Sequence, residues 1–174
     1  DVVEIGVPFT DPMADGVTIQ RSSHAALASG VSLRWILAKL AAAKGIDAPL
    51  ILMSYLNPLL AYGFDSLVSN AAKSGVCGFI VPDLPYEESG EFRRALAAEN
   101  LGLIQLVTPA TPEDRLKKWW AASQGFIYAV TVVGITGGSE DLPADLTDYL
   151  DRVKSCASIP VCAGFGVRSA EQVV

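Results

Sequence analysis

The chain has 174 residues, 51% of them hydrophobic, which is enough to bury one sizeable core and too few for two. Its formal net charge of -6 is spread along the sequence, and Lys and Arg never form a patch with interleaved aromatic residues, which argues against nucleic acid and membrane surfaces as partners. No apolar run reaches the roughly 18 residues of a membrane-spanning helix, and no signal-peptide pattern is seen. We therefore expect a soluble, cytoplasmic protein with a single domain over residues 1–174.

The first predicted strand covers residues 1–5 and alternates, so that Val3 and Ile5 face one side while Val2 and Glu4 face the other. We expect Glu4 to point into the mouth of a barrel. A carboxylate held among apolar neighbours has its charged form disfavoured, which raises its pKa into the range where it can both donate and accept protons. From spacing alone, a structural role and a catalytic role for Glu4 are equally favoured.

The loop after this strand, residues 6–16, is long for a strand-to-helix connection. Its prolines stiffen it, and it carries two acids, Asp11 and Asp15. Taken alone, Asp15 before Gly16 is more simply a turn former. In the helix predicted next, His24 has no metal-ligand spacing to any Cys, His or acid, and we expect it to be a partly exposed helix residue.

Short β-branched runs and Ala- and Leu-rich stretches of helical period then alternate to the end of the chain. Six strands spaced by helices, with no Gly-rich turn after the first strand, predict an α/β fold of the (β/α)8 TIM-barrel type, with about six of its eight strands in this chain. The clearest helix start is Thr111-Pro112, where we expect Thr111 to cap the helix. The other predicted strands are 50–54, 78–81, 102–107, 126–130 and 160–163, and the predicted helices are 18–29, 32–44, 65–74, 89–99, 112–121, 144–155 and 169 onward.

The three cysteines are odd in number and lack paired spacing. Each has apolar neighbours, so we interpret Cys77, Cys156 and Cys162 as reduced thiols in the core. The pair Trp119-Trp120 fits one aromatic residue facing the core and one facing outward, and an interface is the less favoured reading.

Residues 4–20, Glu-Ile-Gly-Val-Pro-Phe-Thr-Asp-Pro-Met-Ala-Asp-Gly-Val-Thr-Ile-Gln, closely resemble the signature of the tryptophan synthase α subunit family. The resemblance continues after later predicted strands and spans essentially the whole chain. It is carried there by Met53-Ser54-Tyr55-Leu56-Asn57-Pro58, Val81-Pro82-Asp83-Leu84-Pro85, Gly134-Ile135-Thr136-Gly137 and Gly164-Phe165-Gly166.

The resemblance implies a carbon–carbon lyase that splits indole-3-glycerol phosphate into indole and glyceraldehyde 3-phosphate in tryptophan biosynthesis. It implies that Glu4 is the general acid/base and that Asp15 is a second catalytic carboxylate, which accepts the indole N–H and stabilises the positive charge on the protonated ring. The reaction that it implies needs neither a metal nor a cofactor.

The same resemblance assigns supporting roles. Tyr128 matches a tyrosine beside the reacting centre, although from its position alone its hydroxyl could equally cap the core. Thr136 lies in a glycine-rich lid and is expected to bond Asp15. Glycines bring backbone N–H groups close to a phosphate, so the expected phosphate contacts are Gly137, Gly164 and Gly166.

Pro8 and Asp11 match positions that contact the β subunit, the partner in an α2β2 heterotetramer. Two alternatives stay open at this point. The chain could be a non-catalytic barrel fragment that at most docks on a β subunit, or it could be a free-standing indole-producing lyase that turns over without a partner.

Overall fold

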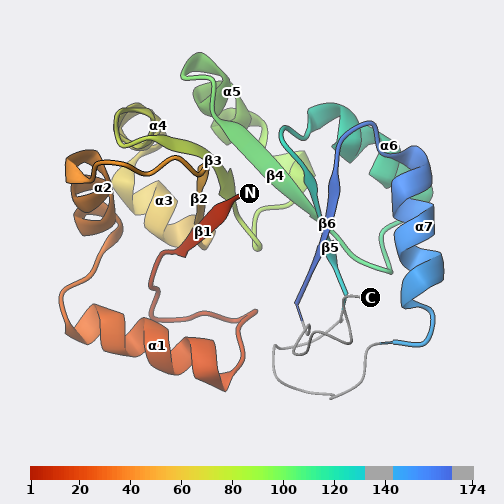
Figure 1. Ribbon diagram of the computed structural model, residues 1–174, viewed down its shortest axis with the longest axis horizontal. Coiled ribbons are helices and arrows are strands. Elements are labelled where there is room, and N and C mark those ends of the chain that lie inside the picture. Colours follow the sequence, from red (N-terminus) through yellow and green to blue (C-terminus); the bar gives the residue numbers. More distant parts are fainter. Residues whose placement is uncertain (132–142, 166–174) are drawn as a thin grey trace. The chain divides into compact units, whose positions relative to one another are not determined.

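The computed structural model describes residues 1–131 and 143–165 (Figure 1). It divides into two compact units. The first consists of Asp1–Pro12 and Gln20–Leu103, and the second of Met13–Ile19 and Ile104–Val174. The single domain expected from the sequence stays a prediction, and each unit has its own buried cluster.

The sheet of the first unit consists of β1 (Val3–Gly6), β2 (Leu50–Met53) and β3 (Val76–Ile80), side by side, parallel and in chain order. Apart from Met53 at its end, β2 is buried on both faces, as an apolar run in a parallel sheet requires. The helical elements of this unit, of which α1 begins in the second unit, are α1 (Val17–Ala28), α2 (Leu33–Ala42), α3 (Leu56–Tyr62), α4 (Phe64–Lys73), the 3-10 helix η1 (Tyr86–Glu88) and α5 (Gly90–Ala98).

The core of the first unit forms between this sheet and its helices. On the sheet, Leu52 and Phe79 are paired across β2 and β3, and both are fully buried in the cluster. On α4, Leu67, Val68 and Ala71 recur at helical spacing and fill the facing side. Ile5 of β1 packs against the same cluster, which leaves the other face of the sheet to Glu4 and its neighbours.

The second unit repeats the plan with β4 (Gly102–Val107, in this unit from Ile104), β5 (Ile127–Val130) and β6 (Val161–Gly164), again parallel and in chain order. Its helices are α6 (Glu113–Ala122) and α7 (Leu146–Cys156). Ile127 and Ala129 of β5 are fully buried against these helices, so Tyr128 and Val130 belong to the opposite face.

The alternation of strands and helices confirms the predicted α/β class, and the six predicted strands all form within the described residues. The predicted helices do not include α3 and η1. One local prediction was wrong. The N-cap of α6 is Pro112, and Thr111 instead accepts a hydrogen bond from Thr108 N at 2.9 Å, which closes a turn before the helix.

The cysteines are free, as expected, but Cys77 and Cys162 are exposed rather than in the core. Trp120 is buried, whereas Trp119 is only partly buried and lies under Arg115, so the pair divides between core and surface as predicted.

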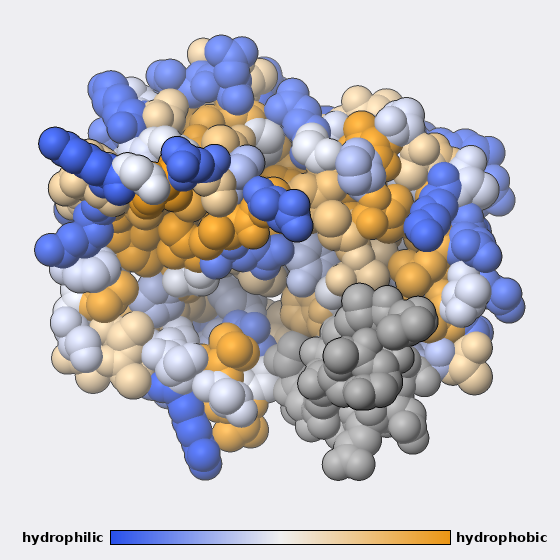
Figure 2. All heavy atoms as spheres, in the orientation of Figure 1, coloured by the Kyte–Doolittle hydropathy of each residue, from blue (hydrophilic) through white to orange (hydrophobic). Residues whose placement is uncertain are grey.

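Within residues 1–131 and 143–165, no single helix is long and apolar enough to cross a membrane. Only when α1 and α2 are taken together are they long and apolar enough for a span, and this pair of helices is bent by 78°. Figure 2 shows hydrophobic side chains at the surface beside charged ones. The large hydrophobic residues with the most exposed side chains include Val3 in β1, Met13 in the loop that follows, and Val17 and Ile19 in α1.

Candidate functional site

Glu4 lies in β1, where it pairs with Ile51 of β2 on the face of the sheet opposite the helix-covered core. This is the orientation that the alternation of the strand predicted. Its side chain keeps access to solvent, yet the atoms around it partly desolvate the carboxylate and raise the pKa of Glu4 above the ordinary value for glutamate. Glu4 is therefore a group that retains its proton at a higher pH than a free glutamate and can serve as an acid.

The loop after β1 is fixed at several points within the first unit. Val7 N donates to Met53 O at 2.8 Å, which extends the ladder past the end of β1. The Ser23 hydroxyl of α1 accepts from Phe9 N at 2.8 Å and donates to Phe9 O at 2.9 Å. Since Phe9 has both backbone groups satisfied by one side chain, the middle of this loop has a defined path.

Pro8 and Asp11 lie on either side of that anchored point. Pro8 is partly buried, whereas Asp11 is exposed and accepts a short hydrogen bond from the Thr10 hydroxyl. His24, an exposed helix residue as expected, has its Nε2 3.2 Å from Thr10 O. Asp11 therefore presents its carboxylate to solvent.

A hydrogen bond and a ring contact link the loops after β1, β2 and β3. The ring of Phe9 lies 5.4 Å from that of Tyr55, which is buried after β2. The next residue, Leu56, donates its N–H to the carboxylate of Asp83, which follows β3, at 2.8 Å. We did not predict roles for Tyr55 and Asp83, because the sequence signalled these segments only by their position after strands.

The second unit contains Asp15, Tyr128 and Gly164. Asp15 is partly buried in a bend two residues before α1. Tyr128 of β5 lies over Gly164 of β6 so closely that a Cβ at residue 164 would fall on its hydroxyl oxygen and ring. A side chain at residue 164 would displace the tyrosine ring, a reason for glycine that the sequence did not reveal.

The turn after β6 is held by Thr131, which lies at the end of β5 and is almost fully buried. Thr131 N donates to Gly164 O at 3.0 Å, and its hydroxyl bonds the carbonyl oxygens of Gly164 and Phe165. Phe165 has a φ of +70°, which is strained for a residue with a side chain. Thr131 thus holds the backbone of the predicted phosphate-binding segment in a bent conformation.

The remaining predicted site residues, Thr136, Gly137 and Gly166, lie outside the described residues. The set is therefore distributed: Glu4, Pro8 and Asp11 in the first unit, and Asp15, Tyr128 and Gly164 in the second. Within residues 1–131 and 143–165, no group of three or more His, Cys, Asp or Glu side chains is placed to hold a metal ion.

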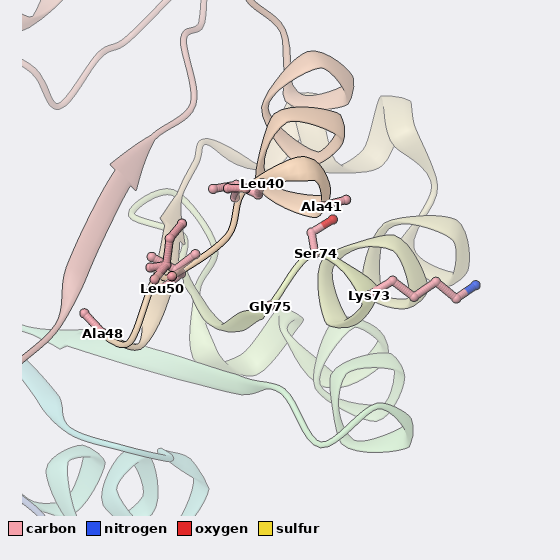
Figure 3. Close-up of a pocket in the computed structure, with 10 residues that line it drawn as sticks. Leu40, Ala41, Ala48, Leu50, Lys73, Ser74 and Gly75 are labelled. Atoms are coloured by element: carbon pink, nitrogen blue, oxygen red, sulfur yellow. The ribbon is translucent and has the colours of Figure 1, made fainter.

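A hollow of about 250 Å³ lies in the first unit, away from these residues (Figure 3). It is lined by the C-terminal ends of α2 and α4 and by Ala48 and Leu50, at the start of β2. The Lys73 side chain points away from the other labelled residues, and Ser74 Oγ already donates to Leu37 O at 3.0 Å. Functional groups of parallel α/β folds gather at the carboxyl ends of strands, so this hollow is at the wrong end of the sheet to be the active site.

A family model described as "Tryptophan synthase alpha chain" matches residues 1–174. The chain is 48% identical over 174 residues to the tryptophan synthase alpha chain of Nitratidesulfovibrio vulgaris, with 99% of this chain and 68% of the relative covered. It is 47% identical over 173 residues to that of Bacillus cereus, covering 99% of this chain and 67% of the relative.

Among solved structures, a chain of the tryptophan synthase α2β2 complex from Pyrococcus furiosus matches with a TM-score of 0.90 and 37% identity, covering 99% of this chain and 70% of that chain. The chain thus spans about two thirds of the length of these relatives.

Proposed function

Because the chain belongs to the family of tryptophan synthase alpha chains, we propose that it is a carbon–carbon lyase that cleaves indole-3-glycerol phosphate to indole and glyceraldehyde 3-phosphate in tryptophan biosynthesis. The observation that carries the proposal is the match over residues 1–174, which includes the segment from Glu4 to Asp15. A cytoplasmic location, in keeping with this biosynthetic role, is part of the proposal.

Glu4 is the proposed general acid/base. It delivers a proton to C3 of the indole ring and takes the proton of the glycerol hydroxyl, and the electrons of the broken carbon–carbon bond return to the ring. The raised pKa of its carboxyl supports this role, because an acid whose proton is retained nearer to neutral pH is better matched to donating it there.

Asp15 is the proposed second carboxylate. It accepts the indole N–H and offsets the positive charge that the ring gains when C3 is protonated. Tyr128 and Thr136 are proposed substrate contacts, and Gly137, Gly164 and Gly166 are proposed phosphate contacts through backbone N–H groups. The bent backbone at Phe165, between two of these glycines, supports the last assignment.

The proposed partner is the β subunit in an α2β2 complex, as in the Pyrococcus furiosus complex, one chain of which this chain resembles. The exposed carboxylate of Asp11 and the nearby Pro8 are the proposed contacts. Both lie in the loop that connects Glu4 to Asp15, so a partner bound there would act on the segment that carries the proposed catalytic groups.

Glu4→Gln tests the assignment directly. The amide keeps the shape of the side chain but cannot shuttle a proton, so indole release should fall by a factor of about 10²–10⁴. The matched control is Glu113→Gln, which makes the same change in an exposed ion pair with Lys117 on α6 and should leave turnover unchanged. Near-normal turnover by Glu4→Gln would contradict the proposal.

The same assay, run with and without β subunit, separates the two other readings. Turnover that the β subunit does not alter would favour a free-standing lyase. Binding to the β subunit without turnover by the unmodified chain would favour a docking fragment.

A further inference from the structure

The N-terminus of α3 takes its cap from a different loop. Its N-cap residue, Tyr55, provides no side-chain hydrogen bond to the helix. The first helical N–H, that of Leu56, is instead bonded at 2.8 Å by the carboxylate of Asp83, 27 residues further along the chain. A carboxylate at this place satisfies an amide that the helix itself cannot pair and complements the positive end of the helix dipole.

Tyr55, the residue before Leu56, is in contact with the proposed catalytic loop. Tyr55 is 6% exposed, and its ring lies 5.4 Å from that of Phe9 at an interplanar angle of 31°. Ser54, the residue before it, donates its N–H to Ile80 O at 3.0 Å and its hydroxyl to Tyr55 O at 3.0 Å. The residues on either side of Tyr55 are therefore bonded to the β3 side of the sheet, by Ser54 N–H to Ile80 O and by Leu56 N–H to Asp83, and the buried Tyr55 ring packs against Phe9.

Phe9 lies between Glu4 and Asp15 in the sequence, in the loop whose path the proposed chemistry depends on. Ser23 bonds both backbone groups of Phe9, and Tyr55 contacts its ring. The contacts from Asp83 to Leu56 and from Tyr55 to Phe9 all lie within the first unit.

We propose that Asp83 is a positioning residue, which sets the path of the loop of residues 7–12 through Tyr55 and Phe9 and so tunes turnover without touching substrate. The effect on turnover rests on the proposed function, whereas the effect on the loop does not. The competing role is a helix cap that adds stability and nothing else.

The kinetic test compares Asp83→Ala with Asp83→Asn. Alanine removes the acceptor for Leu56 N–H, and we expect kcat/KM for indole release to fall about tenfold, a modest factor because the bond is exposed to solvent. Asparagine keeps an oxygen at the same place and should restore most of the loss. The matched control is Asp65→Ala, which removes an acid from the first turn of α4 and should leave kcat/KM unchanged.

A double-mutant cycle with Phe9→Leu tests the route of the effect. If Asp83 acts through the ring contact of Phe9, Asp83→Ala should cost clearly less in the Phe9→Leu background than in the wild type. Equal losses in both backgrounds, or Asp83→Asn as impaired as Asp83→Ala, would overturn the positioning role.

Hydrogen exchange on the substrate-free chain makes the proposal testable even if the unmodified chain does not turn over. We expect Asp83→Ala to speed exchange at Leu56 N–H and also in residues 7–12, while Asp83→Asn stays near wild type. Faster exchange at α3 alone, with residues 7–12 unchanged, would leave Asp83 a simple cap and reject the proposal. Absence of turnover in the wild type would count against the proposed function only.

Discussion

Glu4 and Gly164 differ in how much of their role can be predicted from the sequence alone. The face on which Glu4 lies follows from strand alternation alone, and its burial-raised pKa follows from apolar neighbours that the sequence displays. The need for glycine at position 164 depends on Tyr128, which lies 36 residues earlier and reaches it only when β5 and β6 pair. No local pattern carries that information.

The close approach of Tyr128 makes Gly164→Ala a strong test of the packing between β5 and β6. The new methyl group would fall on the tyrosine hydroxyl and ring, so the ring must move, and we expect the free energy of unfolding to drop by about 1–3 kcal/mol. Urea unfolding measures the change. Gly6→Ala is the matched control, because nothing lies within 4 Å of a Cβ placed there.

The result also tests whether ring packing explains the glycine at position 164. If Gly164→Ala were as stable as the wild type, the tyrosine ring would be free to leave its place over β6. Glycine would then be explained by the proposed phosphate contact alone.

Elements were predictable where the sequence periodicity is strong. The bounds of β4 agree with the prediction at both ends, because Gly102 to Val107 is an apolar run between turn residues. The helix α3 was missed because it has only 7 residues and carries Pro58, which reads as a breaker but is tolerated in a first turn. Thr111 failed as a cap because Thr108, three residues earlier, competes for its hydroxyl.

The helix α7 is attached to the end of β4 by contacts that the sequence could not predict. Tyr149 is buried and donates its hydroxyl to Val107 O at 2.8 Å. Three residues on, Arg152 donates to Pro109 O at 2.7 Å and to Thr111 O at 3.3 Å. Burial also raises the pKa of Tyr149, so the hydroxyl keeps its proton and remains a donor. One turn of α7 thus holds the loop between β4 and α6.

Tyr149→Phe should therefore destabilise the second unit. The change removes a donor and leaves the carbonyl of Val107 without that partner, and we expect a loss of about 1–3 kcal/mol in the free energy of unfolding. Ser155→Ala on the same helix is the control, since its exposed hydroxyl bonds only groups on its own helix. Equal midpoints for Tyr149→Phe and wild type in urea would show that this bond does not secure the helix.

At the scale of the whole molecule, the alternation of strands and helices predicted the α/β class, and the family match extends over the whole chain. Composition counts hydrophobic residues without showing where they gather. The buried residues that the structure describes form two clusters, one that includes residues of α2, β2, α4, β3 and α5 and one that includes residues of β4, β5, α6 and α7, and the expected single domain stays a prediction. The proposed catalytic acids are divided in the same way, with Glu4 in the first unit and Asp15 in the second.

A matched pair of leucines tests whether the two clusters act as separate cooperative regions. Leu67 on α4 and Leu116 on α6 are both fully buried, each in a different cluster. Replacing either with alanine leaves a cavity and should cost about 2–5 kcal/mol. Because each cavity is lined by residues of one cluster, we expect native-state hydrogen exchange to accelerate mainly in the unit that holds the substitution. Leu60→Ala, at a leucine that is 53% exposed, controls for the loss of side chain without a cavity. If Leu67→Ala instead lowered protection in β5 and β6 as much as in β2 and β3, the two clusters would unfold as one.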